Sequence, residues 1–330
     1  MLLKKINWQN PVVLIICFLL VISVRFNRND LLVKRSLGDA QFYIENVRFF
    51  RGESITYGLQ APFNERLLVT FIAAPLPFTP MTSINIVNVL FLALALFYLN
   101  KTLDLMVTDK RLKWGGLYMF VFSFPTFYYA TIGYIDSGVL AMIFVATYAI
   151  YTNKYGLFLS AVVLGTLAKE GIVIVLPVAL AYGLSSENRR WLAFGFIGLI
   201  LYLVVWGAVK KYIPYTEPGK PLLFWNPVFW RLNDNLTRYN TYVSSPLSFG
   251  IPGALCLFFI FKQKKNLIKY WKEDLPLWVG AAGGFLLWVY SIFSAHVDGR
   301  FFWIAYCFPI LLSMVWWNRY GNPFTKLKKS

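Results

Sequence analysis

The stretch "GLFLSAVVLGTLAKEGIVIVLPVALAYGL", from Gly156 to Leu184, decides the fold of this chain. It is apolar on both sides of the adjacent charged pair Lys169 and Glu170. An apolar run of about 20 residues is long enough to cross a bilayer as one helix. The stretch therefore forms either one long span or two short ones. The choice sets the side of the membrane on which every later loop lies.

Composition indicates a membrane protein. Hydrophobic residues make up 58% of the 330 residues and charged residues only 14%, and the mean hydropathy is +0.56. Soluble domains carry about 25% charged residues, so we expect a polytopic membrane protein with membrane lipids as partners. The net charge of +17 does not indicate nucleic acid, because the basic residues lie in short loops between apolar runs, where they set topology.

Eight further apolar runs predict membrane spans. They cover residues 9–26, 81–100, 114–134, 137–151, 191–209, 247–261, 275–295 and 301–318. The segment 67–78 is too short to cross and contains Pro75 and Pro77. Because proline interrupts a regular helix, we expect this segment to lie at the interface or to re-enter the membrane.

Loop charge favours a hairpin for Gly156–Leu184. With two short segments there, 18 of the 32 basic residues but only five of the 15 acidic ones lie on the inner side. A single span would place "KQKKNLIKYWK" (residues 262–272) and the basic tail outside, against the preference of Lys and Arg for cytoplasmic loops. The sequence therefore predicts an all-α transmembrane bundle of about ten membrane-embedded segments, with both termini cytoplasmic.

No internal repeat or low-complexity linker divides the chain, so residues 1–330 are predicted to form a single membrane domain. Its two long outer loops are 27–80 and 210–246. The run Pro11–Val24 follows two lysines, as in a secretory signal, but no small-x-small cleavage site follows it. We expect an uncleaved first span.

This topology gathers ionisable residues on the outer side. Ionisable side chains at or below the membrane surface are costly, and they are functional candidates by default. They are Asp39, Glu65, Arg66, Asp136, Lys169, Glu170, His296, Asp298 and Arg300.

The first outer loop contains "SLGDAQFYIENVRFFRG", residues 36–52. Its apolar residues recur at helical spacing, which predicts an amphipathic helix on the outer membrane surface. The apolar face is formed by Ala40, Tyr43, Val47 and Phe50, and the polar face by Gln41, Glu45 and Arg48. Ser36 and Asp39 fit a capping box, so spacing alone favours a cap over catalysis for Asp39.

Each remaining candidate also has a plain structural role. Arg66 either binds a phosphate head group bidentately, or is an interfacial arginine that snorkels or pairs with the adjacent Glu65. Asp136 lies in a tight turn, where Asp commonly bonds its own backbone. Lys169 and Glu170 either hold a lipid-linked phosphate or pair with each other or with neighbouring helices.

The last outer turn, "AHVDGRFF" (residues 295–302), contains three ionisable residues. Asp298 and Arg300 form either a surface pair of small energetic value or, through Arg300 at the start of the last span, a contact to an anion. His296 is the single histidine of the chain, which excludes a His-rich metal site. No cofactor is assigned, and a divalent metal ion is left open.

The order of these features resembles the GT-C superfamily of integral-membrane glycosyltransferases. The resemblance covers most of the chain in layout. Its motifs are "GDAQFY" (38–43) in the first outer loop, "APFNERLL" (61–68) before an apolar stretch, "TLAKEG" (166–171) between short helices, and "DGRFF" (298–302) before a last span.

The resemblance implies a polytopic enzyme of cell-surface polysaccharide biosynthesis, here in a bacterial cytoplasmic membrane. It implies transfer of a sugar from a polyprenyl-phosphate or polyprenyl-diphosphate donor to a hydroxyl of a glycan, lipid or protein acceptor on the extracytoplasmic face. Asp39 would be the catalytic base.

The other candidate residues receive their roles from the same resemblance. The donor phosphate would contact Arg66, Lys169 and Arg300. The base or the sugar hydroxyls would be supported by Glu65, Asp136, Glu170, His296 and Asp298. Outer-loop aromatics such as Tyr43 would stack on sugar faces, although the interfacial aromatic belt is the more common role for such residues.

Other interpretations compete with an enzyme. A transporter or flippase of lipid-linked saccharides would explain the polar break at Lys169, but such proteins typically carry a second break and an internal repeat. Neither is visible in the sequence. A structural subunit of a polysaccharide-export assembly would carry no chemistry. An intramembrane protease is disfavoured, because no G-x-S-G motif or paired intramembrane Asp motif occurs.

Overall fold

The structure is a computed structural model that describes residues 8–26, 38–129, 132–214, 228–262, 264–294 and 299–321. These residues form helices joined by turns, and no β-strand occurs among them. In chain order the helices are α1 (Pro11–Phe26), α3 (Ala40–Arg51), α4 (Leu67–Ala73), α5 (Pro80–Met106), α6 (Lys110–Val121), α7 (Phe124–Tyr128), α8 (Asp136–Tyr151), α9 (Tyr155–Ala168), the 3-10 helix η3 (Glu170–Ile174), α10 (Val175–Ser185), α11 (Arg190–Tyr212), α12 (Val228–Thr237), α13 (Tyr239–Lys262), α14 (Lys264–Ser294), α15 (Arg300–Ile304) and α16 (Cys307–Tyr320). The predicted all-α class is confirmed.

Four segments of the described chain are long and apolar enough to cross a membrane. They are Pro80–Met106, Arg190–Tyr212, Thr241–Lys262 and Lys269–Phe293. Four further apolar helical segments, 10–17 residues long, are Pro11–Ser23, Asp136–Tyr151, Tyr155–Ala168 and Glu170–Ser185. A straight crossing takes about 20 residues. The length and composition of the four long helices therefore support a membrane protein.

The stretch Gly156–Leu184 folds as two helices that run in opposite directions. The rings of Tyr155, at the start of α9, and Tyr182, near the end of α10, both lie against Trp191, at 4.9 Å and 6.1 Å between centroids. Both ends of the stretch therefore lie together, and the break at Lys169 lies at the far end. The hairpin favoured by loop charge is the geometry that the chain adopts.

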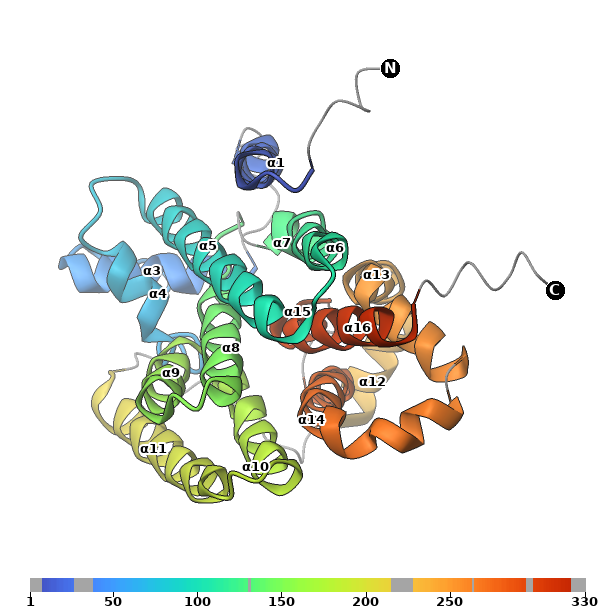
Figure 1. The fold of residues 1–330 in the computed structure, drawn as a ribbon. Helices are drawn as coiled ribbons and strands as arrows, with labels where there is room; N and C mark the ends of the chain where they lie inside the picture. The colour runs from blue at the N-terminus through green and yellow to red at the C-terminus, as the bar shows by residue number, and fades with distance from the viewer. Residues whose placement is uncertain are drawn as a thin grey trace, which may run out of the picture.

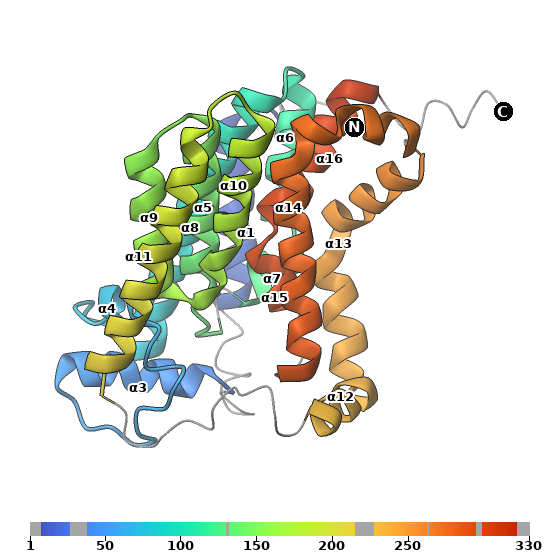
Figure 2. The ribbon, with the colours of Figure 1, turned by 90° about the horizontal axis from the view of Figure 1, so that it is seen from below.

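The loops gather at two opposite ends of the bundle (Figure 2). At one end α3 lies across the other helices, and we call it the α3 end. At the opposite end, the side-chain oxygen of Asn318 accepts hydrogen bonds of 3.1 Å from Thr108 and from the amide of Asp109. The predicted inner loops thus lie together, away from Asp39 and Lys169.

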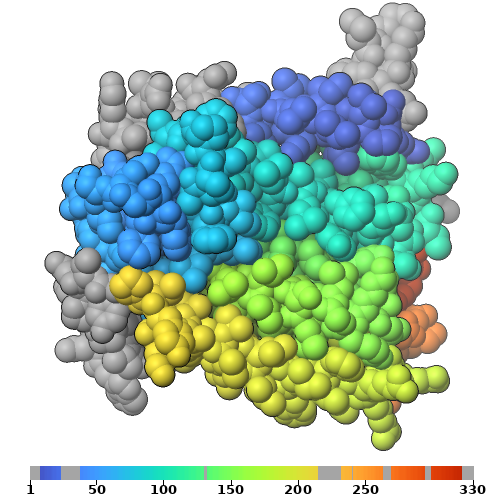
Figure 3. Space-filling view, turned by 90° about the vertical axis from the view of Figure 1, so that its left-hand side faces the viewer, coloured from blue at the N-terminus to red at the C-terminus, as the bar shows by residue number. Residues whose placement is uncertain are grey.

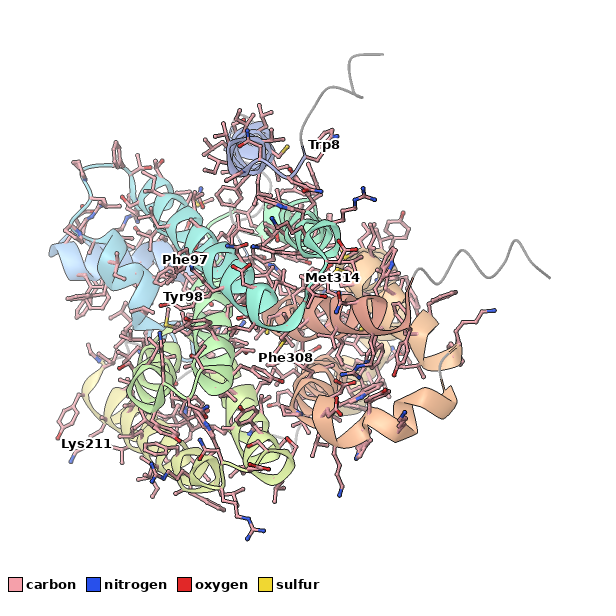
Figure 4. All side chains as sticks on the ribbon, in the orientation of Figure 1. Trp8, Phe97, Tyr98, Lys211, Phe308 and Met314 are labelled. Atoms are coloured by element: carbon pink, nitrogen blue, oxygen red, sulfur yellow. The ribbon has the colours of Figure 1, made fainter. Side chains whose placement is uncertain are left out.

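The core lies around α8, in which all but two residues are buried. Figure 1 shows this helix packed between α5, α9 and α10. Phe308 and Met314 of α16 point into the centre of the bundle, whereas Lys211 points away from it (Figure 4).

Helix α11 exposes a continuous apolar face. Phe196, Ile200 and Val204 are each about three-fifths exposed, and their spacing of four residues places them on one side of the helix. A lipid-facing helix has this pattern, because lipid does not penalise exposed apolar side chains. In Figure 3 the C-terminal end of α11 adjoins the α3 region, and there the Asn64 amide donates to the carbonyl of Pro214 at 2.8 Å.

Three predicted spans are broken, which corrects the sequence interpretation. The run 114–134 ends as α6 at Val121 and resumes as α7, because Pro125 lacks the amide hydrogen that a continuing helix requires. The run 301–318 divides into α15 and α16. The run 247–261 lies within α13, which is kinked at Gly250, where φ is +54°. We therefore do not count ten continuous spans.

The two predicted outer loops contain helices. The first, 27–80, includes α3 and α4, and α4 ends at Ala73 before the two prolines, as expected for an interrupted segment. The second, 210–246, is shorter than predicted, because α11 continues to Tyr212 and α13 begins at Tyr239. The helix α12 lies between them.

Candidate functional site

Asp39 lies at the N-terminus of α3 and binds Arg300 rather than the helix. It occupies the N-cap position, yet its side chain makes no capping hydrogen bond. Its Oδ2 accepts a hydrogen bond of 3.0 Å from Arg300, and the Asp39 side chain is 33% exposed. The predicted capping role of Asp39 is therefore wrong, and Ser36 lies outside the described residues.

Arg300, the first residue of α15, joins Asp39 to a buried carboxylate. Its second guanidinium nitrogen lies 3.9 Å from Oδ2 of Asp136, and the guanidinium lies 4.2 Å from the centre of the Tyr134 ring. Asp136 is 1% exposed and accepts a hydrogen bond from Lys169. It therefore faces two cations and is not a turn residue that bonds its own backbone.

Local helix electrostatics suit this pair. Asp136 is in the first turn of α8, and Lys169 is the residue that ends α9. Carboxylates are stabilised at helix N-termini and cations at C-termini. The two residues thus meet where two helix ends converge, and each carries the charge that its own helix end favours.

Arg66 forms three hydrogen bonds within the site. It donates two hydrogen bonds to Glu170, of 3.2 Å and 2.6 Å, and a third of 2.6 Å to the hydroxyl of Tyr43. Burial raises the pKa of the Tyr43 hydroxyl far above its ordinary value, although Arg66 lowers it. Tyr43 is therefore a neutral partner of Arg66, and its 1% exposure rules out the predicted stacking on a sugar.

These contacts form a ring, because Lys169 and Glu170 are adjacent in the chain and Asp39, the N-cap of α3, precedes Tyr43 by about one helical turn. We call this set the charge ring, and its members are Asp39, Arg300, Asp136, Lys169, Glu170, Arg66 and Tyr43. The ring contains three carboxylates and three cations, so its formal charge is zero. The Asp39 and Glu170 side chains are 33% and 44% exposed, whereas the four other charged side chains are at most 11% exposed.

Two asparagines of α5 position the loop that carries Tyr134 and Asp136. The side-chain oxygen of Asn85 accepts from the amide of Gly133 at 3.1 Å. Asn88 donates to the carbonyl of Tyr134 at 2.5 Å and accepts from Ser137 at 2.5 Å. Both asparagines are buried. The available sequence signal was a pair of amide residues three positions apart in an apolar helix, which our sequence interpretation missed.

Gly133 allows this loop to lie against α3. Its φ is +79°, a region that favours glycine. A Cβ at this position would lie 2.5 Å from the sulfur of Met81 and 3.0 Å from the Cβ of Ala40. The loop therefore approaches α3 one residue after Asp39, and a side chain at position 133 would require Met81 and Ala40 to shift.

The helix α3 is buried on its apolar face and at one residue of its polar face. Its apolar face is buried at Ala40, Tyr43 and Val47, as predicted. Glu45, predicted on the polar face, is also buried, because it accepts from Arg48 and from the amide of Thr56, at 2.8 Å and 2.6 Å.

Three sequence candidates lie outside the ring. Glu65 is half-buried and does not pair with Arg66. Burial raises the pKa of the Glu65 carboxyl, and the nearby Lys210 acts in the opposite direction. His296 and Asp298 lie outside the described residues. Among the residues that the structure describes, no three His, Cys, Asp or Glu side chains are grouped as a metal site would require.

Two apolar cavities flank α13, away from the ring. One, of about 580 Å³, lies between α6, α7 and the kink at Gly250. The other, of about 340 Å³, lies between α13, α14 and α16, and Tyr306 lines both. No member of the charge ring lines either cavity.

Comparison of the chain with protein-family models, with curated proteins and with solved structures gives no match.

Proposed function

We propose that the chain is an integral-membrane glycosyltransferase of the GT-C type. It would move a sugar from a polyprenyl-phosphate or polyprenyl-diphosphate donor to a hydroxyl of a glycan, lipid or protein acceptor, in the assembly of cell-surface polysaccharide. The observation that carries this proposal is the Asp39 carboxylate. It is 33% exposed and is paired with Arg300, one of the three cations of the charge ring. The motifs that resemble GT-C enzymes supply most of the residues of this ring.

The chemistry requires a base and a cation near each other. Asp39 takes the proton from the acceptor hydroxyl as its oxygen bonds to the anomeric carbon. The bond between that carbon and the phosphate oxygen breaks, and the electron pair leaves with the lipid phosphate. Arg300 would stabilise this growing negative charge, and its hydrogen bond to Asp39 supports the assignment of this cation to the same site as the base.

The membrane arrangement belongs to the same proposal. The four long apolar helices and the shorter ones would together provide about ten membrane-embedded segments. Both termini would be cytoplasmic and the α3 end extracytoplasmic, in a bacterial cytoplasmic membrane. The segregation of predicted inner loops from the charge ring supports this orientation, since those loops carry most of the basic residues.

A transfer assay tests the proposal. Membranes containing the protein are incubated with radiolabelled polyprenyl-phosphate sugars and an acceptor extract, and label in the product is measured. We expect Asp39→Asn to abolish transfer while insertion and expression stay at wild-type levels. Glu53→Gln is the matched control, a 46% exposed carboxylate of the same loop that pairs with Arg51 outside the ring. Wild-type transfer by Asp39→Asn would remove Asp39 as the base.

A flippase of lipid-linked saccharides is the second candidate. It is favoured by the helix breaks at Ser123 and Gly250, which lie beside one apolar cavity and which the sequence did not reveal. Discontinuous helices are typical of transporters. In vesicles holding a fluorescent lipid-linked saccharide, a flippase would expose nearly all of the label to an outside quencher without forming any glycan product. A glycosyltransferase would leave the inner half protected.

A further inference from the structure

We propose that the closed charge ring is a resting state and that a phosphate group opens it at one place. The phosphate would take the position of the Asp39 carboxylate on Arg300, so that ligand binding releases Asp39. This inference rests on the proposed function, because the phosphate is that of the lipid-linked donor.

The ring leaves no cation unpaired for a phosphate. Each of the three cations already faces at least one carboxylate, as the ion pairs with Asp39, Asp136 and Glu170 show. A phosphate that binds here must therefore replace a carboxylate. Arg suits this exchange, since its planar guanidinium binds carboxylates and phosphates through the same pair of N–H groups.

The pairs differ in how easily the carboxylate can leave. Asp136 is 1% exposed, so its release from Lys169 would strand a charge inside the bundle. Glu170 is held by two hydrogen bonds from Arg66, which is only 9% exposed.

Asp39 is bound less firmly. Among the described residues it is held by one hydrogen bond, of 3.0 Å from Arg300, and it is already 33% exposed, so its released carboxylate would enter water. The contact between Asp39 and Arg300 is therefore the link that opens.

Arg300 would remain in place after the exchange. Its other guanidinium nitrogen stays 3.9 Å from Asp136, and its plane stays over the Tyr134 ring. The released Asp39 carboxylate would be free to accept a hydrogen bond from the acceptor hydroxyl, so donor binding would be coupled to catalysis.

Binding measurements on the full chain test this exchange. The protein is placed in phosphatidylcholine nanodiscs, and its affinity is measured for polyprenyl monophosphate and, separately, for inorganic phosphate. Asp39→Asn removes the competing charge, and we expect it to bind phosphate about fivefold more tightly, which corresponds to about 1 kcal/mol, the upper range for an exposed ion pair. Arg300→Gln should lose the binding. Asp104→Asn, which removes a 42% exposed carboxylate paired with Lys113 at the opposite end, should leave it unchanged.

Each outcome decides the exchange. Tighter binding in Asp39→Asn supports it, and the probe that shows the gain tells whether a lipid or a free phosphate is the ligand. Equal or weaker binding in Asp39→Asn overturns it, as does full binding by Arg300→Gln.

Sugar transfer by the wild-type protein is measured separately. Transfer together with an unchanged Asp39→Asn affinity would remove the exchange and leave the proposed function. A gain in affinity in Asp39→Asn without any transfer by the wild-type protein would support the exchange and remove the proposed function.

Discussion

The contact between Asp136 and Lys169 gives the sharpest stability prediction. Their side chains are 1% and 7% exposed, and the ammonium of Lys169 also lies 5.6 Å from the centre of the Phe301 ring. Asp136→Asn leaves Lys169 buried without an adjacent carboxylate, and Lys169→Met leaves Asp136 with only Arg300, at 3.9 Å. Removing one partner of a buried pair costs about 3–5 kcal/mol, so we expect each single variant to unfold at a clearly lower temperature.

The double variant distinguishes a coupled pair from two unrelated sites. Replacing both partners removes the stranded charge, so Asp136→Asn/Lys169→Met should cost less than the sum of the single variants by more than about 1 kcal/mol. Unfolding in nanodiscs, followed by intrinsic tryptophan fluorescence, measures all three variants against wild type. Additivity within about 0.5 kcal/mol would refute the coupling. The exposed pair of Asp104 and Lys113 is the control, for which each single change should cost less than about 1 kcal/mol.

Three further predictions concern the surroundings of the ring. Tyr43→Phe leaves a guanidinium N–H of the buried Arg partner unsatisfied, so it should lower the free energy of unfolding by about 1–3 kcal/mol, and unchanged stability would contradict the contact. Gly133→Ala should destabilise more than Gly52→Ala, because φ is positive at both glycines but only the Cβ at position 133 meets neighbouring atoms; equal melting temperatures would show that the close approach is not maintained. In a background without the native cysteines, Glu53→Cys and Asp104→Cys should react with a membrane-impermeant maleimide from opposite sides, and labelling of both from one side would contradict the proposed topology.

Much of the helix arrangement was predictable because topology depends on charge counted over many loops. The hairpin at Lys169 follows from that count, and the contacts of Tyr155 and Tyr182 with Trp191 confirm its geometry. Hydropathy could not locate the breaks at Ser123 and Ala305, since residues on both sides of each break are apolar. Such breaks depend on local backbone restrictions, such as that imposed by Pro125, two residues after Ser123.

The members of the site were largely predictable, whereas their pairing was not. An ionisable residue within or beside an apolar segment is costly, so the sequence alone marks Arg66, Asp136 and Lys169. Which carboxylate each cation meets depends on how helices distant in sequence pack, and Arg66 bonds to Glu170, 104 positions away, instead of the adjacent Glu65. The helical spacing predicted the apolar face that buries Tyr43, but not the hydrogen bond of its hydroxyl to Arg66.

Two ion pairs of the charge ring stabilise the fold, whereas the contact of Asp39 with Arg300 would serve ligand binding. Opening the contact of Lys169 with Asp136 would leave charges inside the bundle, because the two side chains are 7% and 1% exposed. Opening the contact of Arg66 with Glu170 would break two hydrogen bonds and leave the 9% exposed Arg66 without its paired carboxylate, whereas Arg300 keeps Asp136 nearby when Asp39 leaves. The contact of Asp39 with Arg300 also joins α3 to α15, 261 positions apart, but it can open toward water while the other pairs hold the helices together. Asp136→Asn should therefore lower stability, whereas Asp39→Asn should keep the melting temperature and change phosphate binding. A loss of stability in Asp39→Asn as large as that in Asp136→Asn would mean that the ring acts as one structural unit and that no part of it is free to exchange.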